Sequence, residues 1–335
     1  MCDCLVALGT ATDGVSRFAK NSDRPPGEAQ RVEWHAPRRD TSPLRVTHVE
    51  VEVARGETIG VLGSRPWWMW GFEHGVNEAG VAMGNETIYT TLDPRQCEPG
   101  LTGMDVVRLA LERSATARDA VAVAADLVER YGQGGTGHYG KERPYFSSFL
   151  IADATSGWVV ETSGRVWEAE AVADVRAISN RTTIPAFDAE HRHPRQPVAT
   201  LVDPRWNASK RVLASRPVTA AALARHLRSH DGGDGGWTVC MHVDGVEATT
   251  ASVVADLPVA GPPVARMLLG SPCRSVFVPL VVGQPADGFP AWERFARLTD
   301  DVRPALDELE DSLDRATTNA EALALVEACL SSLGV

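Results

Sequence analysis

The sequence lacks a long hydrophobic run and lacks any excess of positive charge. No uninterrupted apolar stretch reaches the about 18–20 residues that a membrane-spanning helix needs. The 335 residues include 33 Lys and Arg against 44 Asp and Glu, which gives a formal net charge of −11. This acidic balance argues against nucleic acid or an anionic membrane as the partner. Because no basic segment precedes the short apolar stretch at the start, we expect no signal peptide.

Cysteine is also scarce. Six cysteines are scattered over the chain, without the dense spacing of a small disulfide-stapled domain. A chain of 335 residues can bury a large core without such crosslinks. Hydrophobic residues make up 44% and charged residues 23%, as in ordinary globular proteins rather than disordered or fibrous ones. We therefore expect free thiols and a cytoplasmic protein.

The order of the predicted elements indicates an α+β fold of two antiparallel sheets with helices outside. The turn signal Asp13-Gly14 separates two apolar stretches and predicts an N-terminal hairpin. Alternating or helical periods predict further strands at 49–53, 146–152, 158–161 and 238–242, and helices at 106–111, 117–131, 219–229, 300–313 and 319–330. Since no repeat of solenoid length or clear linker interrupts the chain, we expect one domain over 1–335 with a helical tail from about 290.

Cys2 is the most informative position in the chain. Aminopeptidases remove Met1 when the second side chain is small, and the product would carry a thiol and a free α-amine on one residue. An α-amine has a pKa of about 7.7–8.0, so it can take the proton of its own thiol near pH 7. Such an N-terminal nucleophile attacks a carbonyl and forms an acyl-enzyme. The plain alternative is a buried, inert cysteine packed in a strand.

A series of ordered motifs accompanies Cys2, and the chain resembles one known family through them. It is similar to the secernins and the C69-type dipeptidases, within the cysteine branch of the N-terminal-nucleophile hydrolases. The resemblance runs from residue 2 to about residue 282 and implies a four-layer αββα sandwich, in agreement with the predicted elements. The motifs are Cys2-Asp3, Lys20-Asn21-Ser22-Asp23-Arg24-Pro25, Gly75-Val76-Asn77-Glu78-Ala79-Gly80, Gly84-Asn85-Glu86, Gly103-Met104-Asp105, Ile178-Ser179-Asn180 and Thr249-Thr250-Ala251-Ser252.

The resemblance implies a set of catalytic residues. Cys2 takes the position of the nucleophile, and Lys20 takes that of a basic residue whose charge favours the thiolate. Asp23 corresponds to an aspartate that holds the new α-amine. Asn85 corresponds to an amide of the oxyanion hole, and Asn180 to a second asparagine near the nucleophile. Without the family pattern, the lysine and aspartate would be a solvated turn pair and the asparagines ordinary turn residues.

Two further positions complete the predicted site. Arg211 matches a late arginine of the wider superfamily, although Lys210 and Arg216 compete for that match. Trp70 is the candidate for lining the substrate pocket, with packing in the core as the alternative. Cys4 departs from the family pattern, in which a small residue is common, and adds a second thiol on the same strand face.

These features predict an amide hydrolase that cleaves a dipeptide or another small N-acyl compound through a thioester on Cys2. No metal or organic cofactor is expected, because the Cys2-x-Cys4 pair has no partner pair and His191-Arg192-His193 has no further ligand nearby. We expect no nucleic acid or membrane partner and leave a homo-oligomer open. Two alternatives remain: an acyltransferase on the same scaffold, and a non-catalytic, secernin-like binding or regulatory protein.

Overall fold

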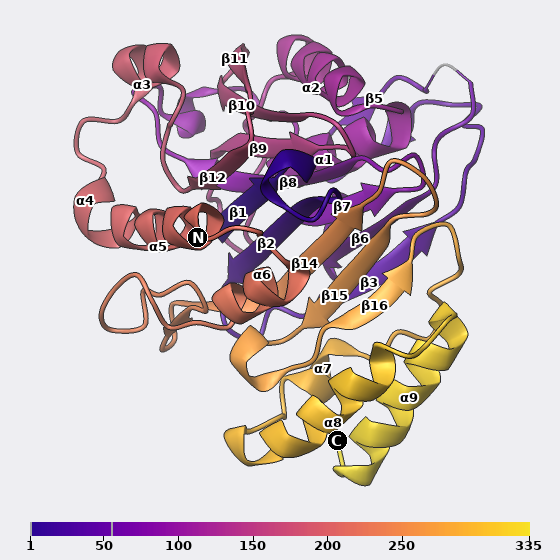
Figure 1. Ribbon diagram of the computed structural model, residues 1–335. Coiled ribbons are helices and arrows are strands. Elements are labelled where there is room, and N and C mark those ends of the chain that lie inside the picture. Colours follow the sequence, from indigo (N-terminus) through magenta and orange to yellow (C-terminus); the bar gives the residue numbers. More distant parts are fainter. Residues whose placement is uncertain (1, 55) are drawn as a thin grey trace.

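The computed structural model describes residues 2–54 and 56–335. Two large antiparallel sheets pack face to face, and helices cover both outer faces (Figure 1). The predicted α+β class and the four-layer αββα arrangement are therefore confirmed. Met1, whose removal the sequence predicts, lies outside the described residues, and the assignment of one domain stays a prediction.

The first sheet contains the N-terminal strand. Pairing along β1 and β2 places Cys2 opposite Ser22, and pairing of β2 with β14 places Asp23 opposite Thr249. The start of β1, the end of β2 and the start of β14 therefore meet at one end of this sheet. In spatial order its strands are β12 (Val175–Ser179), β1 (Cys2–Ala7), β2 (Ser16–Arg24), β14 (Glu247–Leu257), β15 (Val264–Leu269) and β16 (Val278–Val281), and β13 (His242–Val243) pairs with β14.

The second sheet faces the first across the central core. Its strands lie in the order β11 (Val166–Ala171), β10 (Gly157–Ser163), β9 (Phe146–Ala152), β8 (Ala82–Ile88), β7 (His74–Asn77), β6 (Val61–Pro66) and β3 (Gln30–His35). A separate two-stranded ribbon is formed by β4 (Leu44–Arg45) and β5 (Glu50–Val51).

Helices form the two outer layers. The pair α1 (Gly103–Arg113) and α2 (Ala117–Tyr131) covers the second sheet, and α1 begins with a capping box between Thr102 and Asp105. The first sheet is covered by α5 (Asp203–Ala214) and α6 (Ala220–Leu227), while α8 (Arg303–Leu313) and α9 (Asn319–Ser332) pack at its β16 edge. The short helices are α3 (Pro185–His191), α4 (Val198–Leu201) and α7 (Trp292–Phe295). Within the described ranges, every helix is too short or too polar to cross a bilayer.

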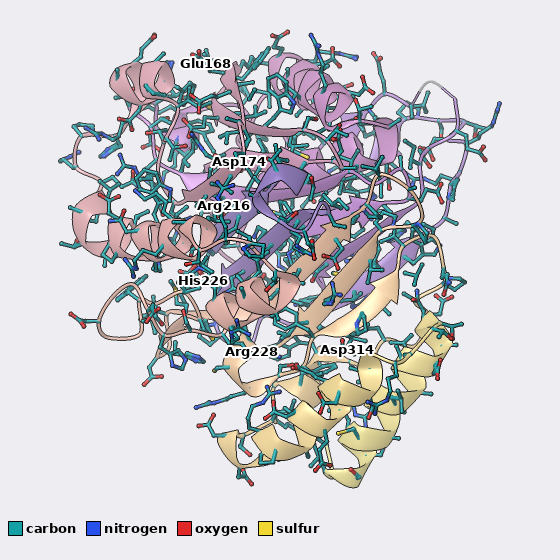
Figure 2. All side chains as sticks on the ribbon, viewed as in Figure 1. Glu168, Asp174, Arg216, His226, Arg228 and Asp314 are labelled. Carbon is teal, nitrogen blue, oxygen red and sulfur yellow. The ribbon has the colours of Figure 1, made fainter. Side chains whose placement is uncertain are left out.

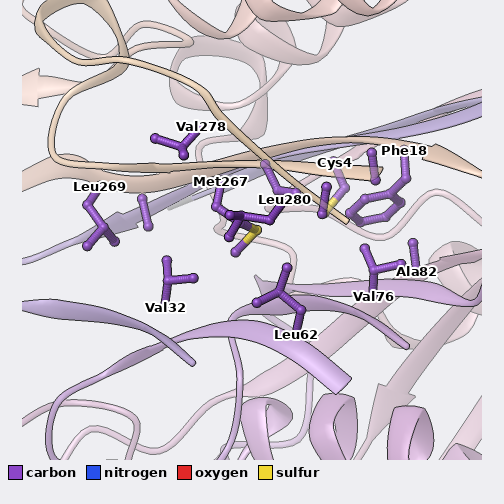
Figure 3. Close-up of a cluster of buried hydrophobic side chains, with 14 of the residues drawn as sticks. Cys4, Phe18, Val32, Leu62, Val76, Ala82, Met267, Leu269, Val278 and Leu280 are labelled. Carbon is purple, nitrogen blue, oxygen red and sulfur yellow. The ribbon is translucent and has the colours of Figure 1, made fainter. Parts of the chain in front are cut away.

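Alternation along β1 divides its side chains between two cores. Cys4 and Val6 face the second sheet, whereas Leu5 and Ala7 face the layer of α5 and α6. Figure 3 shows the central core, where Cys4 and Phe18 of the first sheet lie across from side chains of the second. By the same alternation the side chain of Cys2 points between the sheets, and that of Asp3 points toward α5.

Candidate active site

Cys2 is held from two neighbouring strands at the start of β1. Its backbone N–H donates to Asn180 Oδ1 at 2.9 Å, just beyond the end of β12. Its Sγ accepts the backbone N–H of Asp23 at 3.4 Å. Only 6% of the residue is exposed. The nitrogen and the sulfur of Cys2 are therefore both fixed by residues that the family resemblance implicates.

Lys20 lies on the same face of the sheet as Cys2 and is fully buried. Its Nζ donates to Ser22 Oγ at 2.7 Å, and Ser22 Oγ lies 3.1 Å from Nδ1 of His74. Burial lowers the pKa of His74, and the charge of Lys20 lowers it further, which favours the neutral ring. In the tautomer with the proton on Nε2, Nδ1 accepts a hydrogen bond from the Ser22 hydroxyl. A Cβ on Gly84 would lie 2.6 Å from Lys20 Cδ, so the opposite sheet leaves this lysine its space only because residue 84 is glycine.

The electrostatics around the thiol favour its protonated form in the chain as it stands. Burial raises the pKa of the Cys2 thiol to about 12, although the positive charge of Lys20 opposes the rise. Burial likewise raises the pKa of Glu86, which sequence reasoning did not single out beyond its motif, and that of Cys4. Because the thiolate is the nucleophilic form of cysteine, a reaction at Cys2 would need a base that takes the proton of this thiol.

Asp23 and Arg205 form the other half of the cluster, on the helix side of the first sheet. Arg205, on α5, is fully buried. Its guanidinium donates hydrogen bonds to the carboxylate of Asp3 and, at 3.0 Å, to Asn180 Oδ1. Its Nη1 also lies 4.0 Å from Asp23 Oδ2. Burial raises the pKa of Asp23 to about 7, against the lowering effect of Arg205. Asp23 Oδ1 accepts from Thr249, but Oδ2 has no hydrogen-bond donor within the described part of the chain.

The arginine at the site is not the one predicted from the sequence. Arg211 is exposed on the outer side of α5, and Lys210 lies over the ring of Trp206. Arg216 forms an ion pair with Asp174, and Figure 2 shows both of these side chains next to each other. Arg205 instead connects β1, through Asp3, to Asn180.

Asn85 and Trp70 make no hydrogen bond to Cys2 within the described part of the chain. Asn85, on β8, donates from Nδ2 to Met104 Sδ at 3.4 Å, and its Oδ1 has no partner among the described residues. Trp70 is half-buried and packs against the core beneath α1, with the guanidinium of Arg108 4.1 Å from its ring centre. Trp70 does not line the cavity described below, and its role at the site stays a prediction.

A cavity of about 580 Å³ opens beside the cluster. Thr87 lines the cavity, and its carbonyl oxygen accepts a 3.0 Å hydrogen bond from Asn180 Nδ2. Asn180 therefore connects the cavity wall to Cys2. Tyr145 also lines it and donates to Met104 Sδ at 3.2 Å, the sulfur that Asn85 contacts. The tryptophan that lines this cavity is Trp237 and not Trp70. The sequence did not indicate Trp237 as a site residue, because it lies in a Gly-rich loop.

Comparison with known proteins finds one matching sequence family and several similar solved structures. The sequence model of peptidase family C69 matches residues 12–203. Among solved structures, penicillin V acylase from Agrobacterium tumefaciens is 15% identical, with a TM-score of 0.49 over 84% of this chain and 86% of that chain. A C2A mutant of conjugated bile acid hydrolase from Clostridium perfringens is 12% identical, with a TM-score of 0.48 over 79% and 88% of the two chains. An acid amidase ortholog that hydrolyses N-acylethanolamines, from Caenorhabditis elegans, is 13% identical, with a TM-score of 0.45 over 76% and 92%.

Proposed function

The chain belongs to peptidase family C69 and is thus a hydrolase of peptide or amide bonds, and on that premise we propose that Cys2 is its N-terminal nucleophile. The proposed substrate is a dipeptide or another small N-acyl compound. One observation carries the proposal. The backbone N–H of Cys2 is hydrogen-bonded to Asn180 and its sulfur to the backbone N–H of Asp23, beside a cavity of substrate size.

The proposed reaction begins once the peptide bond before Cys2 has been cut. The freed amine takes the proton of the thiol, and the thiolate attacks the amide carbonyl carbon. The terminal ammonium gives its proton to the substrate nitrogen, the tetrahedral intermediate collapses with loss of the free amine, and a thioester remains on Cys2. Water, deprotonated by the same terminal amine, then cleaves the thioester and restores the thiol.

Two charged neighbours support this sequence of steps. The buried ammonium of Lys20 favours the thiolate over the thiol. Asp23 Oδ2, which lacks a hydrogen-bond donor among the described residues, is available to a terminal ammonium at Cys2. A positive charge at that place would lower the pKa of Asp23 and keep its carboxylate ionised at neutral pH.

Of the two asparagines, Asn85 is the better donor for the oxyanion. Both ends of the Asn180 side-chain amide already have hydrogen-bond partners. Its Oδ1 accepts from Cys2 and Arg205, and its Nδ2 donates to the carbonyl oxygen of Thr87. Among residues 2–54 and 56–335, Asn85 donates only to the thioether sulfur of Met104, which is a weak acceptor. If the oxyanion of the transition state replaces this sulfur as the acceptor, the Asn85 amide forms a charge-assisted hydrogen bond in place of a weak one.

We expect Asn85→Ala to lower kcat by about 10²–10³-fold with little change in KM, because the lost bond forms only in the transition state. Steady-state kinetics on one dipeptide measure both constants. Asn207→Ala, at an exposed position of α5, is the matched control and should leave both unchanged. An unchanged kcat in Asn85→Ala would assign the oxyanion to other donors.

The cavity suggests which small substrates fit. Arg143 and Arg195 line it together with the acidic residues Asp93 and Glu247, and the charge of Arg143 helps to lower the pKa of Glu247. Arginine binds carboxylates through paired hydrogen bonds. A dipeptide offers such a carboxylate one residue away from its scissile carbonyl, so the free acid should bind better than the corresponding amide.

The experiment for the proposed function is a panel of dipeptides and their C-terminal amides, with products identified by mass spectrometry. The proposal predicts release of free amino acids and faster cleavage of the free acids. Addition of an amine acceptor separates hydrolysis from transfer, because a transferase would yield a new amide instead of the acid. Failure to cleave any member of the panel would remove the dipeptidase assignment.

A further inference from the structure

A second cluster of reactive side chains lies outside the candidate active site. One ligand atom from each of four residues lies within 4.8 Å of the other three, and the residues are His230, Cys240, His242 and Cys273. They come from the segment after α6, from the start of β13 and from the turn after β15. Among residues 2–54 and 56–335, no other set of His, Cys, Asp and Glu has such geometry.

The distances in the cluster fit a tetrahedral ion. Nε2 of His242 lies 3.3 Å from Sγ of Cys240 and 3.2 Å from Sγ of Cys273. Bonds of about 2.3 Å to sulfur and about 2.1 Å to nitrogen, at a tetrahedral angle, separate such ligand atoms by about 3.6 Å. These two distances need to lengthen by only a few tenths of an ångström to accept the ion, and none of the other ligand atoms is more than 4.8 Å from its neighbours.

Charge and burial also fit. Cys240 is buried, while His230 is exposed, so an ion has a route into the cluster from solvent. Two thiolates balance the charge of a divalent cation, and the two histidines bind as neutral rings. The set contains no carboxylate, and two sulfur and two nitrogen ligands in a tetrahedron select zinc over calcium or magnesium.

The cluster closes the loop between α6 and β13. Cys240 N–H donates to Ser229 O at 2.9 Å, and His242 N–H donates to Gly236 O at 3.0 Å. Gly236 has a φ of +86°, and a Cβ there would lie 2.0 Å from the carbonyl oxygen of His242, so the backbone turns back tightly at this point. The four side chains converge on a loop whose backbone already brings two of them together.

This loop connects to the candidate active site. Trp237, within it, lines the 580 Å³ cavity. Met241 N–H donates to Thr249 Oγ1 at 2.9 Å, and Thr249 Oγ1 donates to Asp23 Oδ1 at 2.6 Å. A ligand that holds this loop in place would therefore also hold Trp237 in the cavity wall and the Thr249 hydroxyl that orients Asp23.

We propose a structural zinc site formed by His230, Cys240, His242 and Cys273. All four positions of the tetrahedron are filled by the protein, so no open position remains for substrate or water. The ion holds the loop of residues 230–242 against the turn after β15. It takes no part in the cleavage step, and the proposal is independent of which residue is the nucleophile.

The test starts from the unmodified full chain, purified with reduced thiols. We expect elemental analysis to give about one zinc per chain. After removal of the zinc by a chelator, added Co²⁺ should give the intense visible bands of a tetrahedral site and near-ultraviolet sulfur-to-cobalt absorption. A chain that contains no zinc and gives no such cobalt spectrum would overturn the proposal, as would a disulfide between Cys240 and Cys273 in the native protein.

Variants locate the ion. Cys240→Ser and Cys273→Ser should each lose most of the zinc and the sulfur-to-cobalt absorption, whereas Cys97→Ser, a partly exposed cysteine elsewhere, should retain both. Limited proteolysis should cut the loop of residues 230–242 faster in the zinc-free chain than in the loaded one. Full zinc content in both cysteine variants would place the ion elsewhere and contradict the assignment. Because the cobalt spectrum is read on the unmodified chain, a variant that fails to fold leaves the test intact.

Discussion

Cys2→Ala should lower kcat/KM for a cleavable dipeptide by at least about 10³-fold. Removal of a covalent nucleophile leaves only binding and oxyanion stabilisation, which give a small residual rate. Alanine is also small enough at the second position to permit removal of Met1, so the mature variant would differ from the parent chain only at the sulfur. The measurement is the initial rate of amino acid release by both chains at equal concentrations of folded protein.

Cys329→Ser is the matched control for this loss. That cysteine lies on α9, partly exposed and distant in the fold from the start of β1. It should leave the rate unchanged, and a thiol-directed electrophile should inactivate the control and the parent chain equally. Cys2→Ala activity within tenfold of the parent rate would exclude Cys2 as the nucleophile.

Arg205→Met should destabilise the protein by about 3–5 kcal/mol at pH 8. Arg205 is the buried cation next to two buried carboxylates, Asp3 and Asp23. Its removal leaves these charges uncompensated in a site without solvent, which is costly even though methionine fills part of the volume. Urea unfolding of the variant and the parent chain, followed by circular dichroism, measures the difference in free energy of unfolding.

The effect of Arg205→Met should depend on pH in a defined direction. Burial raises the pKa of Asp23 from its ordinary value of 3.8 to about 7 in the folded chain, so folding takes up a proton between these values. The contribution of Asp23 to stability is therefore largest below about pH 4 and falls as the pH rises through 7. Without the arginine the folded pKa rises further, so the loss at pH 8 should exceed the loss at pH 5.

Arg211→Met is the control on the same helix. Arg211 is exposed, and substitutions at such positions usually change stability by less than about 0.5 kcal/mol. Equal losses in the two variants would mean that the burial of Arg205 between the carboxylates carries no special weight.

The parts of the site that follow from local pattern could be predicted from the sequence. The turn at Asp13-Gly14 pairs β1 with β2, and that pairing alone brings Cys2 next to Ser22 and Asp23. The predicted terminal helices at 300–313 and 319–330 are present as α8 and α9. The strand expected at 49–53 shrinks to Glu50–Val51, since it pairs only with the two residues of β4.

The residues that sequence reasoning missed are brought in by long-range packing. The inner face of α5 carries Arg205 and Ser209 as well as Ala208 and Leu213, so it shows no apolar stripe and the helix was not predicted. Arg205 lies 203 residues after Cys2, and no spacing rule connects them. The same holds for the histidine and cysteine cluster, whose ligands come from three separate segments.

The central claim is that the sulfur acts together with an amine on the same residue. The most direct test compares two chains released from a fusion by a specific protease, one beginning at Cys2 and one with a single glycine before it. Both contain the same thiols and should have the same circular dichroism and unfolding midpoint. The account predicts that the chain beginning at Cys2 cleaves dipeptides and that the extended chain is slower by at least about 10³-fold. Equal turnover by the two chains would contradict it.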